Sequence, residues 1–151
     1  MSTALVTGAS RGIGAACAVA LANAGFDVGI GYVTDEAGAN ATADAVRAVG
    51  RQAHVVQGDI GVSEQAEGLV TGTEEALGPL DALVLNAGIT RDGLLFRMSD
   101  ADWNDVIATN LTSCFHWTKL LGRPMTRARW GRIVNITSVS GVMGNAGQAN
   151  Y

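Results

Sequence analysis

The chain has 151 residues and a formal net charge of −4, and 48% of its residues are hydrophobic but only 5% are aromatic. This length fits one domain with a sizeable core, and the scarcity of aromatic residues favours small side chains in helices packed closely on a parallel sheet. The surplus of acidic residues argues against nucleic acid as a main partner, because neutralising phosphates requires excess Lys and Arg. No apolar stretch is long enough to cross a bilayer, and no signal-peptide pattern opens the chain. We therefore expect a soluble, cytoplasmic protein.

Short runs of β-branched or aliphatic residues alternate along the chain with longer helical patterns. The runs predict strands at residues 3–7, 27–32, 53–57, 81–86 and 132–137. This alternation implies right-handed crossovers between parallel strands, with helices on both faces of the sheet. The sequence therefore predicts an α/β fold, a Rossmann-type doubly wound parallel sheet, in one domain spanning residues 1–151.

Helical periodicity and stop signals predict four helices. The first ends before Gly25, the second spans residues 35–49, the third runs from Ser63 to the Gly78-Pro79 stop, and the fourth begins after Ser99. Pro124 is expected to kink or end the fourth helix. Each of two helices shows an apolar stripe, made of Ile13, Ala16, Cys17, Ala20, Leu21 and Ala24 in the first and of Trp103, Val106, Ile107, Leu111, Cys114 and Trp117 in the fourth. The two cysteines stand singly in these stretches, which favours buried free thiols of a reducing compartment.

A glycine-rich segment, Thr7-Gly8-Ala9-Ser10-Arg11-Gly12-Ile13-Gly14, joins the first strand to the first helix. Glycines at these positions allow a tight turn and bring backbone N–H groups against a phosphate at the positive end of the helix dipole. The alternative is a tight turn without a ligand. A strand before the segment and a helix after it favour the phosphate site.

The pattern Thr7-Gly-x-x-x-Gly-x-Gly14, together with Asn86-Ala87-Gly88 after the fourth strand, resembles the short-chain dehydrogenase/reductase family. The resemblance implies that residues 1–151 are the N-terminal, dinucleotide-binding part of a longer reductase domain, truncated after its fifth strand. It also implies that Asp59 contacts the adenine, although an Asx turn is an equally good interpretation of this residue. The expected cofactor-binding residues are Gly8, Ser10, Arg11, Gly12, Ile13, Gly14, Asp59, Ile60, Asn86, Ala87 and Gly88. No metal ligand is predicted.

The end of the second strand bears on the choice of nicotinamide cofactor. NAD enzymes usually carry an acidic residue there that binds the ribose hydroxyls, but no carboxylate appears here before Asp35. Without that charge a 2′-phosphate is not repelled, and Arg11 can pair with it. The alternative for Arg11 is a solvated loop cation. We expect NADPH to be preferred over NADH.

Three polar residues are candidates for the reacting centre, and the resemblance assigns their roles. Ser138 lies at the carboxyl end of the fifth predicted strand, where Thr137 and Ser140 offer the same chemistry. It precedes Tyr151 by the thirteen positions typical of the family. Ser138 would hold a substrate carbonyl and Tyr151 would protonate it, assisted by a lysine four residues further on, beyond the given chain. An unperturbed phenol has a pKa of about 10, so such assistance matters. Asn110 would hold a water chain to that lysine, or else bridge backbone groups within the fold.

Four segments are similar to the β-ketoacyl-(acyl-carrier-protein) reductases of bacterial fatty-acid synthesis, namely Asn86–Asp92, Trp103–Val106, Thr109–Leu111 and Met143–Tyr151. This similarity implies reduction of an acyl thioester carried on acyl carrier protein by a homotetramer that assembles through residues around 100–125. Acetoacetyl-CoA reductases, or a non-catalytic NADP-binding fragment, are the alternatives. Arg127, Arg129 and Arg132 would receive the acidic carrier or, equally well, complement a helix end. The 151-residue chain alone is expected to bind dinucleotide weakly without turnover.

Overall fold

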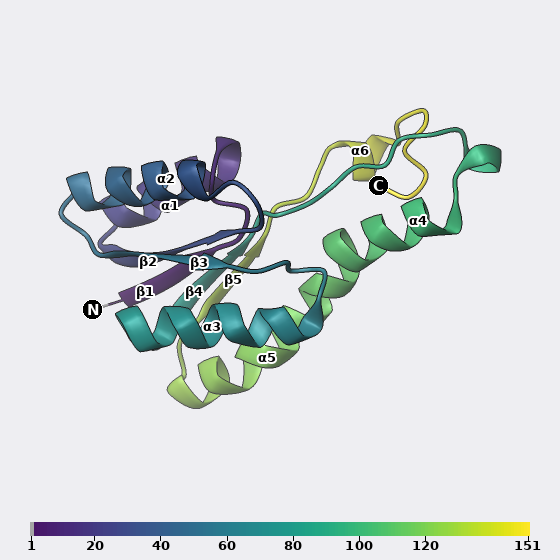
Figure 1. Cartoon of the computed structure of the whole chain (residues 1–151). Helices are drawn as coiled ribbons and strands as arrows, with labels where there is room; N and C mark the ends of the chain where they lie inside the picture. Colours follow the sequence, from purple (N-terminus) through teal and green to yellow (C-terminus); the bar gives the residue numbers. More distant parts are fainter. Residues whose placement is uncertain (1) are drawn as a thin grey trace.

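The computed structural model describes residues 2–151 and contains a five-stranded parallel sheet (Figure 1). The strands are β1 (Ser2–Val6), β2 (Phe26–Tyr32), β3 (Ala53–Gln57), β4 (Leu80–Leu85) and β5 (Arg132–Asn135), in the order β3-β2-β1-β4-β5. The predicted strands are confirmed to within two residues at each end. Because β1 lies between β2 and β4, the chain reverses its winding direction beside β1, and this reversal opens a crevice at the carboxyl ends of the strands.

Helices cover both faces of the sheet, as the doubly wound prediction requires (Figure 1). One face carries α1 (Gly12–Asn23) and α2 (Glu36–Ala48), and the other carries α3 (Ser63–Leu77) and α5 (Ser113–Ala128). Two apolar cores result. The first centres on Leu5, Leu69, Leu83 and Trp117 below the sheet, and the second on Val6, Val28, Ile30 and Val46 above it. The predicted fold class is confirmed.

A smaller lobe extends from the carboxyl ends of the strands (Figure 1). It contains a 3₁₀ turn, η1 (Leu95–Arg97), the helix α4 (Asp100–Ile107) and the short α6 (Ser140–Met143), and the chain ends there. A π-helical segment, η2 (Ala108–Thr112), joins α4 to α5. The lobe therefore brings the loops after β4 and β5 together beyond the carboxyl ends of the strands.

The predicted stripe of α1 is wrong. Ile13, Ala16, Ala20 and Ala24 are exposed, whereas Gly14, Ala18 and Ala22 are buried, with Cys17 and Leu21 at the margins. The helix is apolar on all sides, so its periodicity does not identify the buried face. The smallest residues face the sheet because they allow the helix to approach it closely. Both Cys17 and Cys114 are free but only partly buried.

The predicted fourth helix is in fact divided, and its stripe is partly wrong. Trp103 and Leu111 are 43% and 64% exposed, and the buried positions are Val106, Ser113, Trp117, Leu121 and Met125. The π segment rotates the residues that follow it, so the regular spacing assumed from Trp103 onward fails. Pro124 lies inside α5, which continues to Ala128, so the helix does not end at the proline.

Within residues 2–151, no helix combines the length and apolar character needed to span a membrane. The same residues contain no group of three or more His, Cys, Asp or Glu side chains arranged to hold a metal ion.

Candidate functional site

The turn after β1 packs directly against the segment after β4. Gly8 has a φ of 61°, and a Cβ atom there would lie 2.9 Å from the Cα of Ala87. A Cβ on Gly14 would lie 2.6 Å from Nδ2 of Asn86. Neither position accommodates a side chain, because each would force backbone or a hydrogen-bonded amide to move. The two glycines therefore allow the glycine-rich turn to reach this segment.

Hydrogen bonds fix the same contact. The buried hydroxyl of Thr7 accepts from the backbone N–H groups of Asn86 and Ala87, both at 3.1 Å. The side-chain amide of Asn86 donates in return to the carbonyls of Thr7 at 3.1 Å and Gly8 at 3.0 Å. These four bonds hold the segment after β4 rigidly beside the glycine-rich turn.

The first cavity, of about 650 Å³, lies between this turn, the end of β2 and the loops after β3 and β4. Most of the predicted cofactor-binding residues line it, but Gly12, Ile13 and Gly14 do not, and Ile13 is 63% exposed. The carboxylate of Asp59 accepts a hydrogen bond from the Gly61 N–H at 2.8 Å, so the residue forms the Asx turn and also borders the cavity. The predicted residues in the lining are Gly8, Ser10, Arg11, Asp59, Ile60, Asn86, Ala87 and Gly88.

Residues 32–35 and Arg11 line one end of this cavity. The Asp35 carboxylate lies there, but it caps α2 by accepting from the Gly38 N–H at 2.9 Å. The ion pairs formed within residues 2–151 do not include Arg11, whose guanidinium is exposed. The cavity therefore offers an unpaired cation beside a carboxylate that is already hydrogen-bonded.

A second cavity, of about 740 Å³, adjoins the first, since Asn86, Ala87, Gly88 and Ile89 line both. It brings together the three predicted reacting-centre residues, Asn110, Ser138 and Tyr151. The Ser138 oxygen accepts from the Ser140 N–H at 3.2 Å, which leaves the hydroxyl proton for another acceptor. Of the two alternatives to Ser138, Thr137 also lines the cavity, whereas Ser140 does not.

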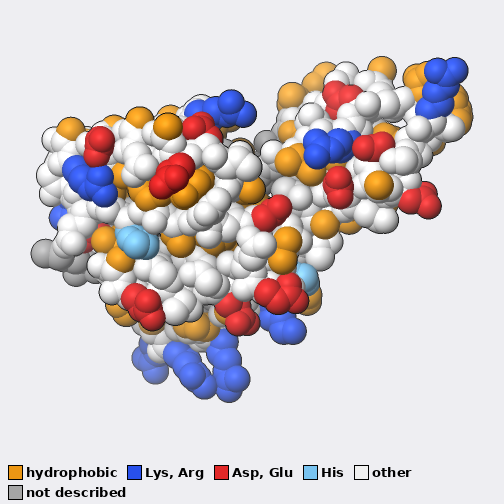
Figure 2. Space-filling model, viewed as in Figure 1, with side chains coloured by type: hydrophobic (Ala, Val, Ile, Leu, Met, Phe, Trp, Pro, Cys, Tyr) orange, Lys and Arg blue, Asp and Glu red, His pale blue; other side chains and the backbone are white. Residues whose placement is uncertain are grey.

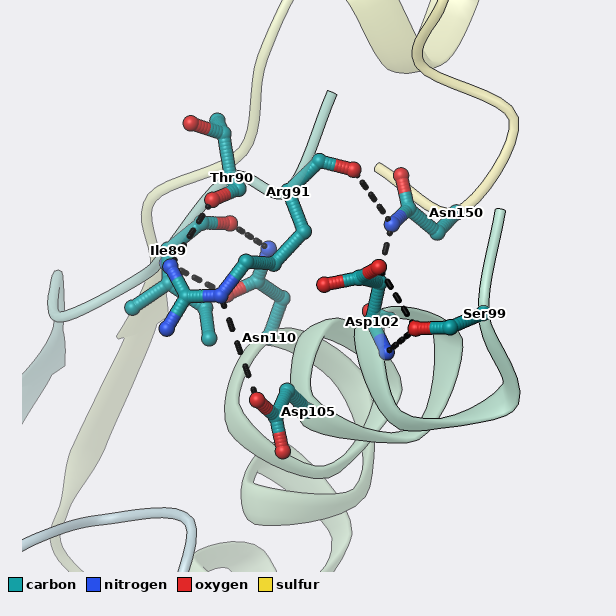
Figure 3. A network of polar contacts seen from close by, with 8 residues as sticks. All are labelled: Ile89, Thr90, Arg91, Ser99, Asp102, Asp105, Asn110 and Asn150. Carbon is teal, nitrogen blue, oxygen red and sulfur yellow. Dashed lines mark hydrogen bonds and ion pairs between the residues drawn. The ribbon is translucent and has the colours of Figure 1, made fainter. Parts of the chain in front are cut away.

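Asn110 lies in the π segment and bridges backbone groups, one of the two roles considered for it. Its oxygen accepts from the Ile89 N–H at 2.9 Å and its nitrogen donates to the Ile89 carbonyl at 2.8 Å (Figure 3). A π segment inside an α-helix is uncommon and often lies at a functional site. The amide thereby fixes the loop that separates the two cavities.

Some residues of the site were not predicted from the sequence. Arg91, Asp105 and Thr109 line the first cavity, and Asn150 lines the second. Arg91 and Asn150 stand inside segments that the sequence marks as characteristic, but nothing in those segments indicates their partners.

The basic cluster of Arg127, Arg129 and Arg132 lies away from both cavities. Lys and Arg side chains gather below α3 at the end of α5 (Figure 2). Arg127 is in the last turn of α5, and Arg132 begins β5, at the opposite end of that strand from Ser138. This position suits the interpretation that cations complement the helix dipole.

Comparison with known proteins identifies relatives over the whole described chain. The family model for short chain dehydrogenases matches residues 2–151. The 3-oxoacyl-(acyl-carrier-protein) reductases of Synechocystis sp. and Pseudomonas aeruginosa are 47% and 48% identical over 148 residues, which are 98% of this chain and 60% of each relative. A crystal structure of a Sinorhizobium meliloti protein assigned to the short-chain alcohol dehydrogenases matches with a TM-score of 0.93 and 37% identity, over 99% of this chain and 59% of that one. The chain thus spans about 60% of the length of these relatives.

The contact between the glycine-rich turn and the segment after β4 predicts a specific effect of Thr7→Val. This nearly isosteric change leaves two backbone N–H groups without their acceptor, which should lower the free energy of unfolding by about 1–3 kcal/mol. Urea unfolding measures the loss. Thr42→Val is the control, because Thr42 is also buried and none of the side-chain hydrogen bonds within residues 2–151 involves its hydroxyl. Equal losses in the two variants would contradict the proposed role of the Thr7 hydroxyl.

Proposed function

The chain belongs to the short-chain dehydrogenase family, and from this premise we propose that it forms the cofactor-binding part of a 3-oxoacyl-thioester reductase. In this proposal NADPH reduces a 3-oxoacyl group on acyl carrier protein to the 3-hydroxyacyl group, as in fatty-acid synthesis. The observation that carries the proposal is the shared wall of the two cavities, formed by residues 86–89. A cofactor in the first cavity would meet a substrate in the second across this wall.

The chemistry follows from the two hydroxyl groups of the second cavity. The reduced nicotinamide would supply the hydride for the keto carbon. The Ser138 hydroxyl, whose oxygen already accepts from Ser140, would donate its proton in a hydrogen bond to the keto oxygen. The Tyr151 phenol, 38% exposed at the cavity, would transfer a proton to the same oxygen as negative charge develops there. Both groups therefore act mainly on the transition state.

The preference for NADPH rests on the end of the first cavity near Arg11. A guanidinium without an ion-pair partner within residues 2–151 is available for a 2′-phosphate. The carboxylate of Asp35 is held at the N-terminus of α2, where the helix dipole and the Gly38 N–H offset its charge. Repulsion of a phosphate by Asp35 is thereby reduced.

The acyl carrier and the assembly complete the proposal. The relatives named as acyl-carrier-protein reductases favour that carrier, and acetoacetyl-CoA is the competing substrate. We propose a cytoplasmic homotetramer, supported by a groove along η2 and the start of α5 that is lined by the exposed apolar side chains of Leu111 and Phe115. Reduction rates of the two thioesters, measured by NADPH oxidation with the full-length protein, test the proposed function.

Arg11→Ala tests the cofactor preference. Loss of one charged contact to the 2′-phosphate should weaken NADPH binding by about 1–3 kcal/mol and leave NADH binding nearly unchanged. Fluorescence titration of wild type and variant with both cofactors measures the effect, and Arg123→Ala on the exposed surface of α5 is the control. Equal affinity of the wild type for NADPH and NADH, or no selective loss in Arg11→Ala, would refute the preference.

Tyr151→Phe and Ser138→Ala test the chemistry in the full-length protein. Each should lower kcat by about 10²-fold or more, because each removes a group that acts on the developing charge, while the affinity for NADPH stays close to wild type. Ser140→Ala is the matched control, since Ser140 lies two residues away but outside the cavity lining. Near-wild-type turnover in Tyr151→Phe would show that another group protonates the carbonyl.

A further inference from the structure

The residue next to Tyr151 connects three separate segments of the chain. Asn150 is 5% exposed, and its Nδ2 donates to the carbonyls of Arg91 at 3.0 Å and Asp102 at 3.2 Å (Figure 3). Arg91 belongs to the loop after β4, and Asp102 to the first turn of α4. One amide therefore joins the loop beside the first cavity, the start of α4 and the loop that carries Tyr151.

Further bonds run between the same two loops. The Gly93 N–H donates to the Gly147 carbonyl at 2.8 Å. The Gln148 amide donates to both carboxylate oxygens of Asp92, at 3.1 and 3.2 Å. Asn150 is the buried member of this contact, whereas Asp92 and Gln148 form an exposed pair. Of the hydrogen bonds between the two loops, those of Asn150 are therefore the least weakened by competition with water.

The partners of Asn150 are themselves held in place. The Ser99 hydroxyl caps α4, accepting from the Asp102 N–H at 3.1 Å and donating to the Asp102 carboxylate at 2.6 Å (Figure 3). Two residues before Arg91, Ile89 is bonded through both its N–H and its carbonyl by Asn110. Two asparagine amides thus fix alternate residues of one loop, and Ile89 and Arg91 both line the first cavity.

The two polar atoms of the Asn150 amide differ in their contacts. Its Oδ1 is buried and has no hydrogen-bond partner among residues 2–151, which is energetically unfavourable. An apolar residue of similar size would avoid this cost if the position served only to fill space. Loss of Nδ2, by contrast, has a structural effect. Its two acceptors are the backbone carbonyls of Arg91 and Asp102, and the positions of these carbonyls depend on their hydrogen bonds to Nδ2.

We propose that Asn150 is a positioning residue that sets the location of the Tyr151 phenol relative to the cofactor cavity. The inference rests on the proposed function. Consecutive Cα atoms are about 3.8 Å apart, so the backbone of Tyr151 moves with that of Asn150. With its amide bonded to Arg91, the backbone at position 151 has a fixed distance from the loop that lines the first cavity. A shift of about 1 Å in such a group can cost on the order of 100-fold in rate.

The test compares the full-length wild type with Asn150→Ala, Asn150→Asp and the control Asn104→Ala. Asn104 is exposed on α4, and its side chain makes no hydrogen bond within residues 2–151. We measure kcat and KM with acetoacetyl-CoA, NADPH affinity, the melting temperature, and deuterium uptake by peptides covering residues 144–151. In Asn150→Ala, kcat should fall by about 10- to 100-fold while KM and NADPH affinity change little, and uptake should rise.

Asn150→Asp provides a readout that a purely structural role would not affect. Facing two carbonyl oxygens, the buried carboxyl of this variant favours its neutral form, which raises its pKa and lets the protonated group donate to one of them. Its kcat relative to that of Asn150→Ala should therefore increase as the pH is lowered.

Three results would overturn the inference. The first is an unchanged kcat in Asn150→Ala. The second is a parallel loss of kcat, NADPH affinity and melting temperature in that variant. The third is a ratio of kcat between Asn150→Asp and Asn150→Ala that does not depend on pH. A wild type that binds NADPH but reduces no thioester would refute the proposed function as well, and this outcome is distinct from an active wild type with an equally active Asn150→Ala.

Discussion

The site depends on close contact between two backbone segments, the glycine-rich turn after β1 and residues 86–87 after β4. The strand order places β1 beside β4, and the absence of side chains at Gly8 and Gly14 allows the segments to touch. The Thr7 hydroxyl and the Asn86 amide then satisfy backbone groups that would otherwise be buried without partners. This contact forms the floor of the first cavity and fixes where the wall shared with the second begins.

The second cavity is built outward from the same wall. Asn110 holds Ile89 from the π segment, and Asn150 holds Arg91 from the loop that carries Tyr151. Both asparagines bond to backbone rather than to side chains, so the loop after β4 is fixed regardless of which side chains project from it. The two cavities are therefore parts of one arrangement, which meet at residues 86–89.

Much of this arrangement could be predicted from the sequence, for physical reasons. Runs of β-branched and aliphatic residues mark the five strands even where a strand is partly exposed, as β3 and β5 are, and the glycines between the first strand and the first helix mark the turn after β1. The buried face of α1 was not predicted correctly, because a helix that is apolar all round has no informative periodicity. The stripe of the fourth helix failed at the π segment, which local sequence does not reveal. The role of Asn150 could not be predicted, because its partners are backbone carbonyls. Every residue type has a backbone carbonyl, so the sequence does not show which ones Asn150 contacts.

The central claim, that residues 86–89 form a wall shared by the cofactor and the reacting centre, can be tested most directly by NADPH titration of the ¹⁵N-labelled chain. We predict that the amide resonances of Gly8, Ser10 and Arg11 shift together with those of Asn86–Ile89 and Tyr151, while those of Phe115 and Lys119, in the groove on α5 outside both cavities, stay unchanged. Shifts at the glycine-rich turn that leave Asn86–Ile89 unaffected, or shifts confined to the groove on α5, would contradict the claim.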